Sequence, residues 1–285
     1  MKTDRPRVWL SVDWDYFCRQ PKAMWSGGQD ETASKSTVSW AIRAAFCLSR
    51  GTYLREEMAL SHARPLPGRF WQALTALGYR FDSLKDIVVA DSHKHAYAFF
   101  RGRDTRNVRL VSFDAHHDLL YTSRLMIEHL TTEKADCGNW HMLTLMRYAK
   151  LRSLLVYPHW KGLFEWRRLM RNLRSVEGGE SALGIKKWIQ RKVHACVWPS
   201  PRIREAAGQV ERIFVCRSSA WSPPWHDEAF YRFVYRGEDH VGLLVNPHKH
   251  GMPPNRDFDW NDVMKTALLE RRLLVLKSKL PFKLV

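Results

Sequence analysis

The chain has 285 residues, of which 45% are hydrophobic and 12% are aromatic. This composition excludes a disordered protein and supplies enough apolar side chains for the core of one large α/β domain. Lysine and arginine outnumber aspartate and glutamate by 46 to 29, and the formal net charge of +17 favours acidic or polyanionic partners without indicating a fold.

Short apolar runs alternate with segments of helical periodicity along the chain. The runs expected to form buried strands cover residues 8–12, 87–90, 109–113, 154–157, 195–198 and 213–216. The expected helices cover residues 37–48, 67–77, 139–152, 162–173 and 227–235, and residues 178–184 are typical of a loop. This alternation predicts an α/β fold with a mostly parallel sheet. No domain boundary is marked, so we expect a single domain over residues 1–285, with the tail from about residue 264 packing on it.

The cysteines are dispersed and odd in number: Cys18, Cys47, Cys137, Cys196 and Cys216. Without CxxC spacing, such a set argues against a disulfide framework or a structural zinc knuckle and favours a reducing compartment. The apolar run near the amino terminus is short, and no stretch is typical of a signal peptide or a membrane span. We therefore expect a cytoplasmic protein with no membrane partner.

Three of the expected strands end in acids and histidines. The sequences that follow them, DWD, DSHKH and DAHHD, supply Asp13, Asp15, Asp91, His93, His95, Asp114, His116, His117 and Asp118. A DxD or a DSH alone is more often a turn or a helix N-cap. Two acids and two histidines within five residues rarely serve packing, because buried charges need partners. Ligands bind beyond the carboxyl ends of parallel strands, so neighbouring strands would bring these clusters to one edge.

The chemistry of this donor set narrows the choice of ligand. Carboxylates dominate, imidazoles are present and no thiol belongs to the three clusters. Such donors suit Mn²⁺ or a similar divalent ion better than the zinc of a cysteine-rich site. The donors suffice for two ions that share bridging carboxylates, an arrangement that activates water as a nucleophile.

These motifs resemble the arginase/deacetylase (ureohydrolase) superfamily. DAHHD is similar to the DAHxD ligand motif of arginases and agmatinases, SVDWD to their SxDxD strand, and CGNWH (residues 137–141) to their SGNxH segment. Together with DSH and the later SSAWSPPWHDEAF, the pattern more closely resembles the arginase-like family that includes peptide arginases. Those enzymes convert arginine side chains of ribosomally made peptides to ornithine. The resemblance spans about residues 8–227.

The resemblance implies a three-layer αβα, arginase-like fold and two Mn²⁺ ions. Asp13 and Asp114 would bridge the ions. His93 and Asp118 would complete one metal position, and His116 and Asp15 the other. The resemblance also implies a catalytic role for Asp118. His141 would shuttle protons to the leaving amine. Attack of the activated water on the guanidinium carbon would yield urea and ornithine.

The sequence departs from ordinary arginases in the order of its motifs. The DxD strand comes first in the chain, so the connectivity would be circularly permuted, and the usual DP after this strand is absent. No acid clearly matches the one that grips the guanidinium, because a solvated helix face accounts better for Glu56 and Glu57. Roles other than ligation or catalysis are expected for the other polar residues beside the motifs, namely contacts to the ligands, helix capping or a surface position: His95, His117, Cys137, Asp91, His226, Asp227 and Glu228.

Three functions remain open. In the first, the protein is a dinuclear manganese hydrolase of peptidyl arginine, and its basic chain attracts an arginine-containing precursor peptide with an acidic leader. The helix near residues 162–174 could bind this leader, unless its apolar side packs on the sheet. A free guanidine such as agmatine is another substrate within this reaction. In the second, the protein is a single-metal zinc amide hydrolase of the deacetylase type. In the third, it is a non-enzymatic nucleic-acid-binding protein that uses the basic stretch 147–192, although no nucleic-acid motif accompanies the charge.

Overall fold

The computed structural model describes residues 6–21, 39–40, 43–44, 47, 53–119, 132–175, 180–242 and 246–247. A seven-stranded sheet runs through this part of the chain in the order β5-β4-β3-β1-β6-β2-β7, and every neighbouring pair is parallel. The strands are β1 (Arg7–Asp13), β2 (Asp86–Ala90), β3 (Val108–Phe113), β4 (Arg152–Tyr157), β5 (Val193–Val197), β6 (Gln209–Cys216) and β7 (Asn246–Pro247). The six predicted strands and the parallel α/β sheet are confirmed.

The central strand β1 is buried because both of its faces are covered. Leu10 and Val12 lie in one hydrophobic cluster, whereas Trp9 lies in a second one. Successive side chains of a strand point to opposite faces, so a strand covered on both sides carries apolar residues at consecutive positions. Ser11 and Asp13 have the same parity as Trp9 and therefore share its face. The strand thus directs its final carboxylate to one particular side of the sheet.

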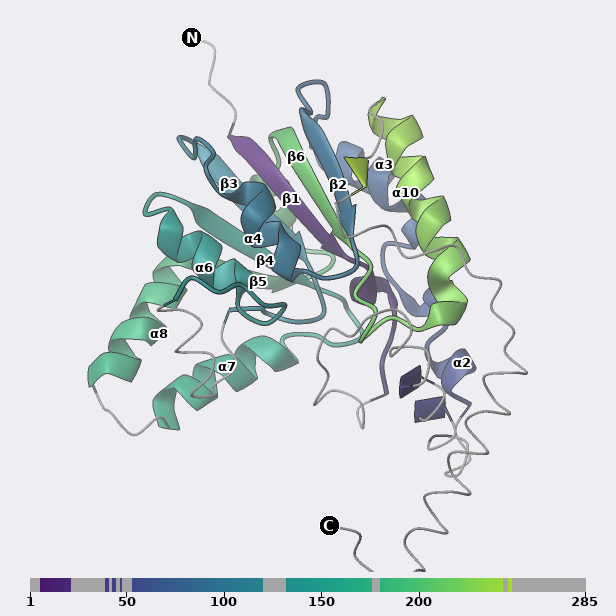
Figure 1. Ribbon diagram of the computed structural model, residues 1–285, viewed down its shortest axis with the longest axis horizontal. Helices are drawn as coiled ribbons and strands as arrows, with labels where there is room; N and C mark the ends of the chain where they lie inside the picture. Colours follow the sequence, from purple (N-terminus) through teal and green to yellow (C-terminus); the bar gives the residue numbers. More distant parts are fainter. Residues whose placement is uncertain are drawn as a thin grey trace, which may run out of the picture.

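Helices cover both faces, which gives three layers (Figure 1). The α-helices are α2 (Leu54–Glu57), α3 (Phe70–Ala76), α4 (Lys94–Phe100), α6 (Trp140–Arg147), α7 (Phe164–Ser175), α8 (Glu180–Lys192), α9 (Pro201–Glu205) and α10 (Asp227–Val241). Short 3-10 turns are η1 (Trp14–Phe17), η3 (Leu60–His62), η4 (Pro67–Arg69) and η5 (Pro224–His226). Residues of α3, α9 and α10 belong to the first hydrophobic cluster, and residues of α4, α6, α7 and α8 to the second. Asp13 therefore faces the layer that contains α4 and α6.

The predicted helices are present with different ends. The segment 67–77 divides into η4 and α3, and α10 continues to Val241, where Gly242 ends it with a φ of +67°. The helix expected over 139–152 ends at Arg147, because β4 already begins at Arg152. The helices α4, α8 and α9 were not predicted.

Two further predictions concern segments with gaps in the description. The loop expected over 178–184 is wrong for residues 180–184, which form the first turn of α8, while 176–179 lie outside the described residues. Of the helix expected over 37–48, residues 39, 40, 43, 44 and 47 are helical and the others are not described. The tail from residue 264 also lies outside the described residues.

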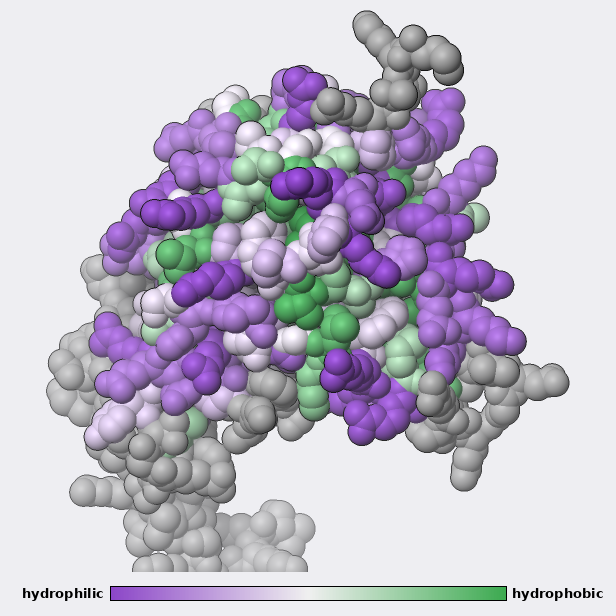
Figure 2. Space-filling view, turned by 180° about the vertical axis from the view of Figure 1, so that it is seen from behind, coloured by the Kyte–Doolittle hydropathy of each residue, from purple (hydrophilic) through white to green (hydrophobic). Residues whose placement is uncertain are grey.

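The order of the strands differs from the simplest expectation. β1 and β3 are neighbours, but β6 lies between β1 and β2. The clusters after β1, β2 and β3 still meet at the carboxyl edge, and the end of β6 joins them there. Within the described ranges, no helix has the length and apolar character needed to cross a bilayer. On the side turned away from the viewer of Figure 1, hydrophilic side chains cover most of the surface and smaller apolar areas lie among them (Figure 2).

Candidate metal centre

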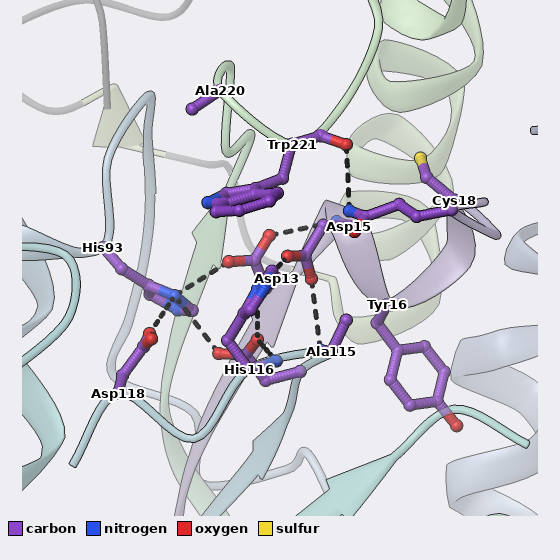
Figure 3. A network of polar contacts seen from close by, with 12 residues as sticks. Asp13, Asp15, Tyr16, Cys18, His93, Ala115, His116, Asp118, Ala220 and Trp221 are labelled. Carbon is purple, nitrogen blue, oxygen red and sulfur yellow. Dashed lines mark hydrogen bonds and ion pairs between the residues drawn. The ribbon is translucent and has the colours of Figure 1, made fainter. Parts of the chain in front are cut away.

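The carboxyl edge of the sheet gathers the acids and histidines of the three motifs (Figure 3). Asp13 is the last residue of β1, Asp114 directly follows β3, and Asp15 lies in η1. His93 is the residue before α4, and Asp118 adopts a φ of +45°, a left-handed conformation that aspartate tolerates better than most residues. All six predicted metal ligands, His116 included, are at most 6% exposed.

The first group of donors surrounds one nitrogen of His93. The Nδ1 atom of His93 lies 2.9 Å from Oδ2 of Asp13, 3.2 Å from Oδ2 of Asp118 and 3.4 Å from Oδ2 of Asp114. An imidazole nitrogen donates at most one hydrogen. Three carboxylates around one such nitrogen therefore form a place that suits a cation.

The second group surrounds His116. Its Nδ1 atom lies 2.7 Å from Oδ2 of Asp15 and 3.9 Å from Oδ1 of Asp114. Backbone amides hold these carboxylates, since Ala115 N donates to Oδ1 of Asp15 at 3.2 Å and His116 N donates to Oδ1 of Asp114 at 2.6 Å. The ring of Trp221 lies 4.4 Å from the His116 ring, so the segment that carries the SSAWSPPWHDEAF motif also reaches the centre.

The two groups meet in Asp114. Donor atoms of His93, Asp114 and Asp118 lie within 4.8 Å of one another, and so do those of Asp15, Asp114 and His116. Each triad offers two carboxylates and one imidazole, and Asp114 belongs to both. The family resemblance implies the same division for these five residues, with Asp13 as a second bridge, but Asp13 belongs to neither of the two triads. Asp13 contacts His93 through Oδ2, while its Oδ1 accepts a hydrogen bond from Asp15 N at 3.0 Å.

Burial makes the ionised forms of the clustered acids energetically unfavourable when no cation is bound. Burial, followed by the charge of Asp15, raises the pKa of Asp13 to about 7, and burial with three neighbouring carboxylates holds the pKa of Asp114 well above its usual range. Burial lowers the pKa of His93, but the charge of Asp13 and hydrogen bonds to Asp118 and Asp13 outweigh this and raise it to about 10. The positive charge of the protonated imidazole thus partly substitutes for the charge of a bound cation. The oxygen-rich donor set and the crowding of buried negative charge both fit a divalent metal.

Side chains outside the predicted set orient the ligands. Trp140 Nε1 donates to Oδ2 of Asp118 at 2.8 Å, and the Trp140 ring stacks on the His93 ring at 4.8 Å. Ser11 Oγ lies 3.0 Å from Nε2 of His93. This contact leaves Nδ1 of His93 directed at the carboxylates, as partners of metal-binding histidines usually do. Sequence reasoning missed both roles, although Ser11 shares the strand parity of Asp13.

The structure does not bring His141 into the donor set. Its side chain is completely buried, and its Nε2 lies 2.8 Å from Oγ of Ser153 on β4. Burial lowers the pKa of His141 to about 4, so the imidazole is neutral at neutral pH. The proton-shuttle role of His141 stays a prediction.

The other polar residues near the motifs lie outside the two triads. Burial lowers the pKa of His117 to about 3, and its Nδ1 accepts a hydrogen bond from Leu119 N at 3.2 Å. Glu56 is exposed in α2 and Asp227 begins α10, where it pairs with the buried Arg217. His226 approaches Cys18, with 3.3 Å between Nδ1 and Sγ.

A second buried charged pair lies beyond β4 and was not predicted. Lys161 Nζ lies 3.5 Å from Oε1 of Glu165, and neither side chain is exposed. Arg168 approaches the other oxygen of Glu165 at 3.2 Å. Burial lowers the pKa of Lys161, although the charges of Glu165, Asp15 and Asp114 oppose this shift. The negative charges of Asp15 and Asp114 thus stabilise the protonated form of this lysine.

Comparison of the chain with protein-family models, with curated proteins and with solved structures gives no match in any of the three. The arginase-like family and the circular permutation therefore stay predictions from the motifs. The parallel α/β sheet and the Asp/His groups able to hold metal ions are features of the structure itself.

Proposed function

We propose that this protein is a dinuclear metal-dependent hydrolase that releases urea from arginine side chains of a peptide and leaves ornithine. The observation that carries the proposal is the carboxylate of Asp114, which belongs to two donor triads at once. A shared carboxylate is the usual means of holding two ions a short distance apart. A single-metal zinc hydrolase would use one triad and leave the other without a role.

The residues of the chain would bind and orient the ions. His93 and Asp118 would hold one ion and Asp15 and His116 the other, with Asp114 between them. Two divalent ions at these positions would supply Lewis-acid charge and activate water as a nucleophile. Carboxylate-rich triads suit Mn²⁺. The nearly complete burial of the ligands keeps bulk water from competing for them.

Arginine within a peptide is a better substrate for this chain than a free guanidine. A protein of net charge +17 repels a small cation on approach, whereas acidic residues around a peptidyl arginine would be attracted. The apolar side of α7 is not available as a docking surface, because Leu169 and Leu173 are buried in the second hydrophobic cluster. Electrostatic attraction of the peptide would therefore act through exposed basic side chains.

For the alternative of a nucleic-acid-binding protein, the basic stretch 147–192 offers less accessible charge than its sequence indicates. Lys161, Lys186 and Lys192 are at most 8% exposed. Lys192 Nζ donates to the backbone carbonyls of Tyr148 and Leu151 at 3.2 and 3.3 Å. Part of the excess charge thus lies inside the protein, where it cannot meet phosphates.

The reaction is tested with Mn²⁺-loaded protein and synthetic peptides that carry one arginine among acidic or neutral residues. We expect urea release and the mass loss of an arginine-to-ornithine conversion, faster for the acidic peptides than for free arginine or agmatine. The Asp114→Asn variant should be inactive on every substrate. Full metal loading without turnover of any guanidine would contradict the substrate while leaving the metal centre in place.

A further inference from the structure

Three potential ligands form a row across three neighbouring strands. The register pairs Asp13 of β1 with Cys216 of β6, and Val12 with Phe113, so that Asp114 follows on the other side of Asp13. Paired residues of adjacent parallel strands direct their side chains to the same face of the sheet. Cys216 belongs to the second hydrophobic cluster, which confirms that its side chain lies on the face of α4 and α6.

The thiol lies beside Asp13 and His93, two of the residues around the first metal position. Donor atoms of Asp13, His93 and Cys216 lie within 4.8 Å of one another. Cys216 is completely buried, and its Sγ lies 3.7 Å from the backbone oxygen of Asp91, two residues before His93. The position of β6 between β1 and β2 is what puts sulfur between these two motifs.

The other buried cysteines do not share this arrangement. Cys18 Sγ lies 3.5 Å from the backbone oxygen of Trp14 and 3.3 Å from Nδ1 of His226. Cys196 lies near the end of β5, with β4 and β3 between it and β1. Among the described residues, Cys216 is the only cysteine in a group that could hold a metal ion.

We infer that Cys216 is a ligand of the first metal position and makes the two positions chemically unlike. The first would combine sulfur with the imidazole of His93 and carboxylates, whereas the second, formed by Asp15, Asp114 and His116, contains only nitrogen and oxygen. Thiolate selects borderline-soft ions such as Zn²⁺ and Co²⁺, so the first position would prefer these over Mn²⁺. Binding forms a metal–sulfur bond and releases the thiol proton to solvent. This inference rests on the dinuclear centre proposed above.

The inference is tested by titrating the full-length protein with Co²⁺ and recording its absorption spectrum. We expect a sulfur-to-cobalt charge-transfer band in the near ultraviolet for the wild type, and loss of this band in both Cys216→Ser and Cys216→Ala. The matched variants Cys18→Ser and Cys196→Ser should keep the band. With Zn²⁺ instead, X-ray absorption should show one sulfur neighbour at about 2.3 Å, absent in Cys216→Ser. The preference of the first position for Zn²⁺ over Mn²⁺ should fall at least about tenfold in that variant.

The outcomes separate the thiol ligand from the metal centre itself. Binding of two Co²⁺ ions per wild-type chain without the band, or with a band that persists in both Cys216 variants, would overturn the role of Cys216 and leave the dinuclear centre standing. Failure of the wild type to bind Co²⁺ or Mn²⁺ at all would overturn the centre and the thiol ligand together. Circular dichroism of each variant shows whether the fold is retained.

Discussion

Nδ1 of His93 lies 2.9 Å from Oδ2 of Asp13, although Asp13 ends β1, His93 follows β2, and β6 runs between those strands. The contact joins a carboxyl whose pKa is about 7 to an imidazole whose pKa is about 10. At neutral pH the metal-free protein therefore keeps a proton on His93. A metal ion that binds both residues must displace it.

Metal binding should consequently depend on pH. Below pH 7 both Asp13 and His93 carry protons, and above pH 7 Asp13 is ionised while the imidazole remains protonated. The apparent metal affinity should rise with pH between 6 and 8, by up to about tenfold per pH unit for each proton displaced. Calorimetric titrations in buffers of different ionisation enthalpy measure the number of protons released. An affinity that does not change over this range would contradict the protonation of the pair.

Asp114→Asn should stabilise the metal-free protein and abolish its stabilisation by metal. The raised pKa of Asp114 means that this carboxyl group destabilises the folded, metal-free protein at pH 8. Removing the charge should therefore increase the metal-free free energy of unfolding. The same variant should lose the stabilisation that added metal gives the wild type.

Denaturant unfolding with and without metal measures both effects of Asp114→Asn. Asp104→Asn is the matched control, because Asp104 is a partly exposed acid paired with Arg7 and Arg106 far from the centre. A metal-free Asp114→Asn protein less stable than the wild type would show that Asp114 is a structural residue.

Trp140→Phe should weaken one metal position only. The change removes the hydrogen bond to Asp118 while keeping an aromatic ring beside His93. Loss of such an orienting contact costs about 10- to 100-fold in metal affinity. A two-step titration should show the first position weakened and the position of His116 unchanged. Trp160→Phe, which removes a hydrogen bond to the backbone of Tyr16, should leave both steps as they are in the wild type.

Glu165→Gln should destabilise the protein strongly. It leaves the charge of Lys161 buried without its carboxylate, and breaking a buried pair in this way costs about 3–5 kcal/mol. Glu228→Gln breaks an exposed pair with Arg232 and should cost less than about 1 kcal/mol. Urea denaturation of the two variants gives the comparison. Equal losses would mean that the buried pair contributes no more than a surface contact.

The sequence predicts the strands of this fold well and the connections less well. Apolar runs such as residues 8–12 fill both faces of a central strand, and a run this short and this apolar suits few structures besides a buried strand. The helix α8 was missed because Gly178, Gly179 and Gly184 are typical of a loop, although the last of these lies within a helix. The helix α4 was missed because it has only seven residues directly after the DSH motif.

The candidate site could likewise be predicted from the sequence only in part. The six Asp and His residues predicted as ligands could be singled out because their motifs are compact and follow strands. Cys216 and Trp140 could not be assigned, since their proximity to His93 depends on strand order and helix placement that no local pattern contains. The burial of Lys161 and Glu165 could not be predicted either, because a basic segment at the start of a helix gives no sign that it is buried.

The most direct test of the central claim is the metal content of wild-type and Asp114→Asn protein, measured by elemental analysis after reconstitution with Mn²⁺ and with Zn²⁺ and removal of free metal. We predict two divalent ions per wild-type chain and fewer than one in the variant, because Asp114 belongs to both triads. A wild-type protein that retains no metal, or a variant that retains two ions, would contradict the dinuclear centre.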